Sequence, residues 1–387
     1  MKSEKALALY LHIPFCRHRC AYCDFNTYTT VSELMSDYVV ALRKEIHQVS
    51  RGTNRPVATV YFGGGTPSLL PASDLGSVLR EIQDSFRLED DVEITIEANP
   101  ETLSPDYLAK IRQAGVNRLS LGAQSADPAQ LALLERTHDF DTVIRAVSYA
   151  KSAGFQNISL DLIYGLPGQS LASWQESLRA VLSLDTQHLS LYCLTIEPGT
   201  PMNRWLMNGR IEPPDPDLAA DQYETAVELL AQHGFEHYEI SNWALPGRAC
   251  RHNVVYWRNG AYLGLGAGAH GHARGYRYSV VKQPRVYIRR MQDHQSGQYP
   301  WSAAVADKRK LTKQDQMSDT VITQLRLLEE GLRLDKFASH FGVDLYAAFP
   351  GICEQLIEWG LLRLEGDRLL LTRRGYFLSN QVFYRFI

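Results

Sequence analysis

The sequence predicts an α/β fold: a partial or nearly closed TIM-like (β/α)6 barrel followed by a small winged-helix-like domain at the C-terminus. Two observations carry this prediction. Apolar strand-like runs alternate with helical patterns six times within residues 1–200, and from about Lys310 the pattern changes to helices followed by a hairpin. A chain of 387 residues with 45% hydrophobic residues can bury a large core and a second, smaller one.

The first predicted strand is Leu7–Ile13. Its apolar run follows lysines, as in a signal peptide, but it is short, has no small-residue cleavage site and continues directly into Pro14. The later predicted strands are Thr59–Phe62, Val92–Glu97, Arg118–Leu121, Ile158–Ile163 and His188–Leu194. The predicted helices between them are Glu33–Ser50, Ser73–Phe86, Pro105–Ala114, Asp127–Glu135, Asp141–Ala153 and Leu171–Leu182. Consecutive βα units favour a parallel sheet with right-handed crossovers, in which functional residues collect at the carboxyl ends of the strands.

Residues 201–305 read as an extension of the barrel domain. A proline-rich breaker precedes a predicted helix at Leu218–Gln232, and six glycines between Gly260 and Gly275 predict a loop. Residues 306–387 read as the winged-helix-like domain. Its predicted elements are the helices Gln314–Leu328, Asp335–Phe341 and Leu345–Trp359 and a hairpin of Leu361–Leu364 with Leu369–Leu371. This order does not make the protein a DNA binder, because fold is not function.

Three cysteines follow the first strand in a C-x3-C-x2-C pattern, Cys16, Cys20 and Cys23. A [4Fe–4S] cluster held by three thiolates leaves one iron open to a small chelating molecule. The amino and carboxylate groups of S-adenosylmethionine suit that iron, and the cluster can supply the electron that cleaves the sulfonium. The alternatives are zinc with His12 or His18 as a fourth ligand, or three unconnected thiols.

Three glycines, Gly63 to Gly65, follow the second strand. Backbone without Cβ atoms lets a ligand approach closely, although a three-glycine turn can also be a tight βα connection. The other cysteines indicate no site by themselves: Cys193 is expected in the strand core and Cys353 in the helix core.

Several motifs resemble the radical S-adenosylmethionine superfamily. They are the cysteine pattern with Tyr22 before its last member, the GGGTP that begins at Gly63, IEANP (96–100), LSLGAQS (119–125) and DLIYGLPGQ (161–169). The stretch YLHIPFC, which ends at Cys16, narrows the resemblance to the group around oxygen-independent coproporphyrinogen III oxidase.

The resemblance implies roles for particular residues. Cys16, Cys20 and Cys23 would bind the cluster, and Tyr10, Gly64 and Glu97 would contact the S-adenosylmethionine bound to it. Residues matching those around a second S-adenosylmethionine in the oxidase are Gly65, Thr66, Gln124, Arg136 and Asp161. For Arg136 and Asp161, a polar network at the strand ends is a serious competing role.

Two departures from the oxidase point to the heme-chaperone branch of the group. Phe25 stands where the oxidase has a further cysteine, and the oxidase's longer N-terminal arm before Tyr10 is absent. That branch also has H-N-x-x-Y-W, which runs here from His252 to Trp257. Both residues are heme candidates, since imidazole can ligate heme iron, but they can equally pack a loop against the barrel. Cys250 could ligate or attach heme, or be a small apolar core residue.

We therefore expect a heme chaperone that binds heme and transfers it to an acceptor hemoprotein, by resemblance a membrane respiratory enzyme, with a reductant protein as a further partner. The alternative is the oxidase, which decarboxylates coproporphyrinogen III; Phe25 and the missing arm favour the chaperone and leave true oxidase activity unexpected. A net charge of −3 disfavours a radical enzyme acting on RNA. Clustered cysteines and the lack of a long apolar segment predict a cytoplasmic protein that is not integral to a membrane.

Overall fold

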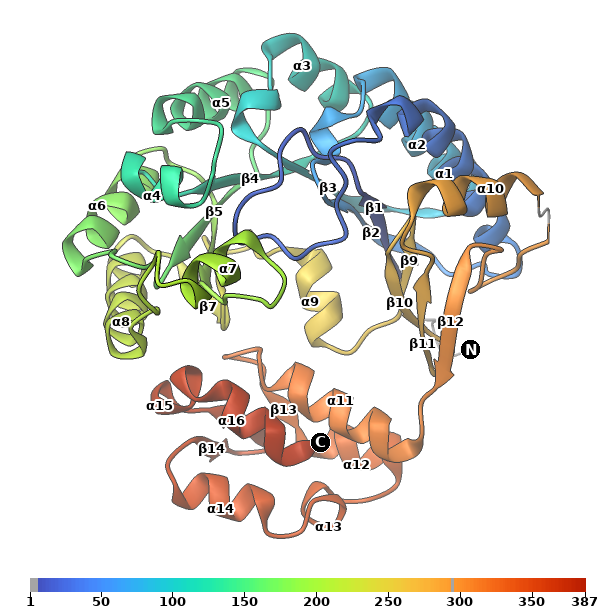
Figure 1. The fold of residues 1–387 in the computed structure, drawn as a ribbon. Helices are drawn as coiled ribbons and strands as arrows, with labels where there is room; N and C mark the ends of the chain where they lie inside the picture. The colour runs from blue at the N-terminus through green and yellow to red at the C-terminus, as the bar shows by residue number, and fades with distance from the viewer. Residues whose placement is uncertain (1–5, 294–295) are drawn as a thin grey trace.

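One large sheet organises most of the chain in the computed structural model, which describes residues 6–293 and 296–387 (Figure 1). Its centre is six parallel strands in sequence order: β1 (Leu7–Ile13), β2 (Val57–Gly64), β3 (Leu88–Ala98), β4 (Arg118–Gln124), β5 (Ile158–Tyr164) and β6 (His188–Cys193). The outer helices are α1 (Met35–Ser50), α2 (Ala72–Ser85), α3 (Pro105–Gln113), α4 (Pro128–Leu133), α5 (Phe140–Ser152) and α6 (Leu171–Leu182). The predicted run of six βα units is confirmed.

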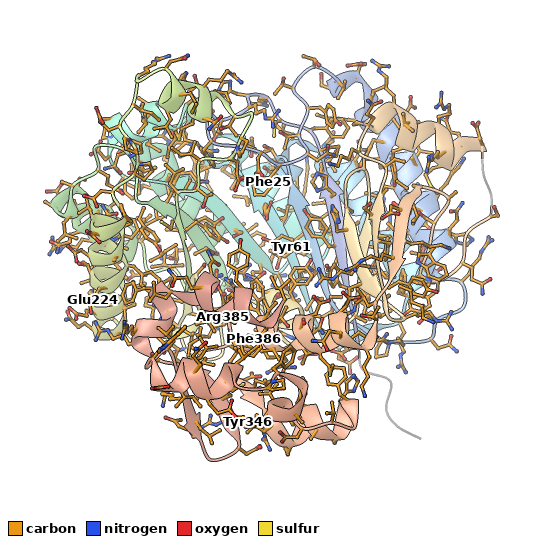
Figure 2. All side chains as sticks on the ribbon, turned by 60° about the horizontal axis from the view of Figure 1, so that its bottom comes forward. Phe25, Tyr61, Glu224, Tyr346, Arg385 and Phe386 are labelled. Atoms are coloured by element: carbon orange, nitrogen blue, oxygen red, sulfur yellow. The ribbon has the colours of Figure 1, made fainter. Side chains whose placement is uncertain are left out.

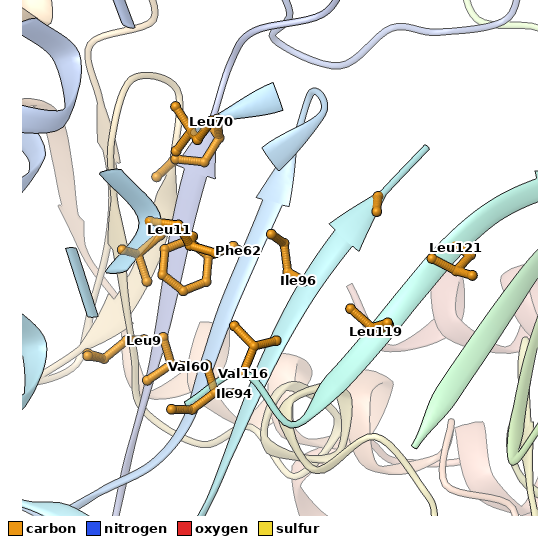
Figure 3. Packing of buried hydrophobic residues seen from close by; sticks show 14 of the residues in the cluster. Leu9, Leu11, Val60, Phe62, Leu70, Ile94, Ile96, Val116, Leu119 and Leu121 are labelled. Atoms are coloured by element: carbon orange, nitrogen blue, oxygen red, sulfur yellow. The ribbon is translucent and has the colours of Figure 1, made fainter. Parts of the chain in front are cut away.

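Alternation along each strand separates two faces of this sheet. Leu9 and Leu11 of β1 and Val60 and Phe62 of β2 pack in one buried apolar cluster, which continues along β3 and β4 (Figure 3). Because successive side chains point to opposite faces, the residues between them face the interior of the curved sheet. This inner face carries polar groups such as Glu97, and the candidate site lies there.

The sheet continues beyond the six predicted strands on both sides. Next to β1 lie β9 (Tyr262–Leu265), β10 (His270–Ala273), β11 (Tyr276–Val280) and β12 (Val305–Lys310); next to β6 lie β8 (Asn242–Ala244) and β7 (Glu236–Glu239). Within the described residues β12 and β7 are the two edges, so the barrel is partial and open.

The prediction of a loop at Gly260–Gly275 is wrong, because this segment contains β9 and β10. Its glycines allow strands to approach closely rather than breaking them. A Cβ atom on Gly264 would lie 1.8 Å from the carbonyl oxygen of His270, on the neighbouring strand. Among the described residues between β6 and β12, the helices are α7 (Pro201–Met207), α8 (Pro216–Gln232), α9 (Arg251–Trp257) and α10 (Pro284–Asp293).

The C-terminal residues have their own hydrophobic core. Its elements are α11 (Lys313–Gln324), β13 (Leu332–Arg333), α12 (Leu334–Phe341), α13 (Leu345–Ala348), α14 (Ile352–Glu358), β14 (Leu362–Glu365) and β15 (Arg368–Leu371), followed by α15 (Arg373–Phe377) and α16 (Ser379–Phe383). The hairpin is confirmed, and Cys353 is buried in α14. The single helix predicted over Leu345–Trp359 is wrong, because Pro350 and Gly351, with φ +74°, divide it.

This C-terminal unit packs below α9, on the open side of the sheet (Figure 1). The guanidinium of Arg326 donates to the buried carboxylate of Glu239 at 3.2 Å.

The predicted domain boundaries after residues 200 and 305 stay a prediction. No helix in the described part of the chain is long and apolar enough to cross a membrane.

Candidate functional site

The cysteine loop leaves the carboxyl end of β1 and is closed at its base. Cys16 N donates to the carbonyl of Tyr28 at 3.0 Å, and Tyr28 N donates to the carbonyl of Pro14 at 2.7 Å. Phe15 is buried and packs edge-on against Tyr38. These contacts hold the loop over the inner face of the sheet.

A cavity of about 440 Å³ lies at this end of the strands. Its lining includes all three motif cysteines and seven of the eight predicted cofactor contacts: Gly64, Gly65, Thr66, Glu97, Gln124, Arg136 and Asp161. Tyr10, the eighth, lines the neighbouring cavity instead. The structure thus gathers residues from β1 to β5 and their following loops, as parallel strands predict.

The three thiols are half-buried. Burial raises the pKa of the Cys16 and Cys23 thiols, and the neighbouring cysteines raise both further. Metal coordination removes that penalty, because a bound thiol is deprotonated outright.

The described residues contain no ready-made site for a single zinc ion. Among residues 6–293 and 296–387, no three His, Cys, Asp or Glu side chains converge closely enough to hold one metal ion. His12 is also engaged: its Nε2 lies 2.9 Å from the Asn26 carbonyl oxygen, and its Nδ1 lies 3.1 Å from the Tyr10 hydroxyl. A four-iron cube instead binds each of the three thiolates to a different iron.

The glycines opposite the cysteines form a cradle that a Cβ atom would fill. A Cβ on Gly65 would lie 2.6 Å from the Phe15 carbonyl oxygen and 3.1 Å from Cys16 Sγ. Gly64 has φ +114°, and its Cβ would lie 2.6 Å from the His12 ring. Bare backbone beside the thiols fits a ligand that must approach the cluster closely.

Glu97 is the carboxyl group beside this cradle. Tyr61 Oη donates to its Oε1 at 2.8 Å, and Gly64 N donates to its Oε2 at 3.1 Å. Burial raises the pKa of Glu97 to about 7. The group therefore exchanges a proton near neutrality and can accept hydrogen bonds from a ligand.

Asp161 and Arg136 belong to polar networks at the strand ends. Asp161 accepts from the hydroxyls of Ser120 and Ser159, and burial raises its pKa. Arg136 donates to Asn99 Oδ1 at 2.8 Å, to the Gly122 carbonyl at 3.0 Å and to Cys20 Sγ at 3.3 Å. The geometry supports the network role for both, and binding of a second S-adenosylmethionine stays a prediction.

Gln124 stands in a strained backbone position. Its φ is +66°, and a register shift between β4 and β5 accompanies it. Non-glycine residues in this region cost free energy and concentrate at ligand sites, so the strain is consistent with a functional position.

His252 and Trp257 lie on α9. His252 is 1% exposed; its Nδ1 lies 2.8 Å from Thr59 Oγ1, and its Nε2 lies 2.8 Å from the Tyr256 hydroxyl. Burial lowers its pKa to about 3. Because both ring nitrogens are engaged, the geometry supports packing of α9 against β2, and heme ligation by His252 stays a prediction. Trp257 lines the neighbouring cavity.

Two further residues in the cavity were not predicted. Tyr61 and Asn99 line it and hold Glu97 and Arg136. Because side chains alternate along a strand, Tyr61 lies on the same face of β2 as Gly63, and this spacing could have indicated it from the sequence.

The expectation that Cys193 lies in the strand core is wrong. This cysteine is exposed and lines the same cavity, because β6 ends there. Cys250 is buried, and its Sγ lies 3.7 Å from Glu93 Oε1.

Comparison with known proteins shows which family this chain belongs to. The model of the radical SAM superfamily matches residues 10–181, and that of the HemN C-terminal domain matches residues 311–378. The heme chaperone HemW of Bacillus subtilis (strain 168) is 36% identical over 380 residues, covering 98% of each chain. The chain belongs to the HemW family.

Other relatives of the HemW family agree. The Mycobacterium tuberculosis heme chaperone HemW is 39% identical over 378 residues, covering 97% of this chain and 93% of the relative. HemW of Escherichia coli (strain K12) is 36% identical over 398 residues, covering 98% of each chain. The coproporphyrinogen III oxidase HemN of Escherichia coli, a radical SAM enzyme, superposes with a TM-score of 0.85 over 99% of this chain and 90% of its own. At 24% identity, that likeness establishes the fold alone.

Proposed function

We propose that this chain is a heme chaperone, which binds heme and transfers it to an acceptor hemoprotein. The observation that carries the proposal is the match over nearly the full length to relatives named heme chaperone HemW. Phe25 supports it, because it stands at the oxidase's extra cysteine and lines the candidate site. By family resemblance the acceptor is a membrane respiratory enzyme, and a reductant protein would serve the cluster.

In this proposal the cofactors would occupy the first cavity, which all of the assigned residues except Tyr10 line. Cys16, Cys20 and Cys23 would hold a [4Fe–4S] cluster, and Tyr10, Gly64 and Glu97 would hold S-adenosylmethionine beside it. When bound, the cluster supplies the electron that can cleave the sulfonium of S-adenosylmethionine. The chain's own contribution is to bind: the glycines leave room, and Glu97 accepts hydrogen bonds. A second S-adenosylmethionine, if it binds as in the oxidase, would contact Gly65, Thr66, Gln124, Arg136 and Asp161.

Glu97 should make the affinity for S-adenosylmethionine depend on pH. The carboxylate is the form of Glu97 that can accept hydrogen bonds from a ligand with both oxygens, and burial raises its pKa in the free protein to about 7. Binding should therefore release a proton, and affinity should rise from about pH 6 to pH 8 and then level off. Glu97→Gln should weaken binding about tenfold and remove this pH dependence. Calorimetry on the reconstituted protein measures both; a wild-type affinity that is flat with pH contradicts this role of Glu97.

Heme transfer tests the proposed function. Protein loaded with hemin is mixed with an apo-hemoprotein that has a different Soret maximum, and the spectrum is followed. The chaperone should pass its heme on faster than free hemin enters at the same concentration. Failure to bind hemin, or transfer no faster than from free hemin, contradicts the proposal.

A further inference from the structure

A second cavity, of about 510 Å³, adjoins the cysteine loop. It lies on the inner face of β9, β10 and β11, and Phe25 lines both cavities. Figure 2 shows Phe25 near the loops and Tyr61 deeper between the strands. The volume falls within the usual range for sites that enclose a small molecule.

Aromatic rings form much of its wall. Phe25 is 62% exposed, and the other rings include Tyr256 and Trp257 from α9, Tyr262 from β9 and Tyr10 from β1. Flat apolar side chains from separate segments can cover both faces of a flat, apolar ligand.

Two histidines project into the cavity from one strand. His270 and His272 are two residues apart on β10, so they share a face. His272 lies directly opposite Tyr262 on β9 and Arg277 on β11. Within residues 6–293 and 296–387 the His270 ring makes no hydrogen bond or ion pair.

His272 lies on the cavity wall beside Tyr262. The two rings pack edge-on, with 6.3 Å between their centroids. Imidazole is a common ligand of heme iron. His12 and His252 are less suitable, because both ring nitrogens of each already lie within hydrogen-bond distance of a partner.

Charge at the cavity suits a ligand with carboxylates. Its described lining contains two permanent cations, Arg277 and Lys282, and no Asp or Glu. Arg277 is paired with Asp319 at 2.8 Å, whereas the Lys282 ammonium makes no ion pair with any described residue. Heme combines a flat apolar ring, a metal that takes imidazole and two propionate carboxylates.

We infer that this second cavity is the heme site, with an imidazole of the His270–His272 pair as the axial ligand and Lys282 binding a propionate. The inference rests on the proposed function. It assigns the axial heme ligand to β10 and not to His252 on α9. The aromatic rings of Phe25, Tyr256, Trp257 and Tyr262 pack on the porphyrin. Phe25, which lines both cavities, would then stand between heme and a cluster on the three cysteines.

Hemin titration of the reconstituted full-length chain, followed by absorbance, tests this assignment. His270→Ala with His272→Ala should raise the Kd for hemin at least about tenfold and shift the Soret band. The single variants identify the ligand. Lys282→Glu should weaken binding several-fold and Lys282→Arg should not. The matched control is His340→Ala, an exposed histidine on α12. Cluster content, S-adenosylmethionine affinity and melting temperature should stay at wild-type values in all of them.

The outcomes separate the two proposals. If wild-type protein binds no hemin, the proposed function fails and this inference fails with it. If wild-type protein binds hemin and the double variant keeps the wild-type Kd and spectrum, the inference fails and the proposed function stands. If the double variant is less stable, the single variants and the Lys282 pair decide: unchanged hemin binding in all four overturns the site.

Discussion

Replacing Cys20 with serine should abolish the cluster and leave the fold intact. A hydroxyl is a poor iron ligand, and two remaining thiolates cannot hold a cube that needs three, so iron should fall from about four per chain to near zero. Cys20 is half-buried in a loop outside the hydrophobic cores, so the sheet should not depend on it. Iron and sulfide analysis after anaerobic reconstitution measures the first effect, and circular dichroism of the cluster-free proteins measures the second.

Cys193→Ser is the matched control, because Cys193 lines the same cavity and lies outside the motif. It should keep a full complement of iron and sulfide. Cys20→Ser protein that also keeps it would show that the assignment of ligands is wrong.

Gly64→Val should lose S-adenosylmethionine binding while the cluster remains. Valine at φ +114° is strained, and its Cβ would lie 2.6 Å from the His12 ring, which Asn26 and Tyr10 hold in place. Relief of both conflicts would move the backbone that donates to Glu97. We expect affinity to fall at least about a hundredfold, more than for Glu97→Gln, because strain of this kind costs about 1–3 kcal/mol before the clash is counted.

Calorimetry measures this loss, and Gly168→Val is its control. Gly168 also has positive φ (+73°), but a Cβ there would meet no atom within 4 Å. That variant carries the backbone strain without the clash and should bind S-adenosylmethionine as the wild type does. Unchanged affinity in Gly64→Val would place the cofactor away from this cradle.

Strand-and-helix alternation was enough to predict the centre of the fold. The run Leu7–Ile13 matches β1 residue for residue, and the residues after each strand meet in one cavity because parallel strands end at one edge. The outer strands could not be predicted in this way. Between Gly260 and Gly275 the glycines that let β9 and β10 approach closely are also the residues that usually mark loops.

This limit also explains what was missed in the candidate site. His270 and His272 lie in the segment predicted to be a loop, so nothing in the sequence placed them on a cavity wall. His252 stood out through its motif, but its partner Thr59 is 193 residues away in sequence, and only the folded chain shows that contact. Cys193 was assigned to the core from its strand, whereas burial stops just before the end of β6.

The proposed heme chaperone handles heme, whereas the oxidase makes a precursor of heme. The most direct measurement incubates reduced, cluster-loaded protein with S-adenosylmethionine and coproporphyrinogen III, and titrates the same preparation with hemin. We predict about one stable heme per chain, without a need for S-adenosylmethionine, and no significant decarboxylation. Protoporphyrinogen formed over many turnovers, with no stable heme complex, would contradict the account and assign the chain to the oxidase.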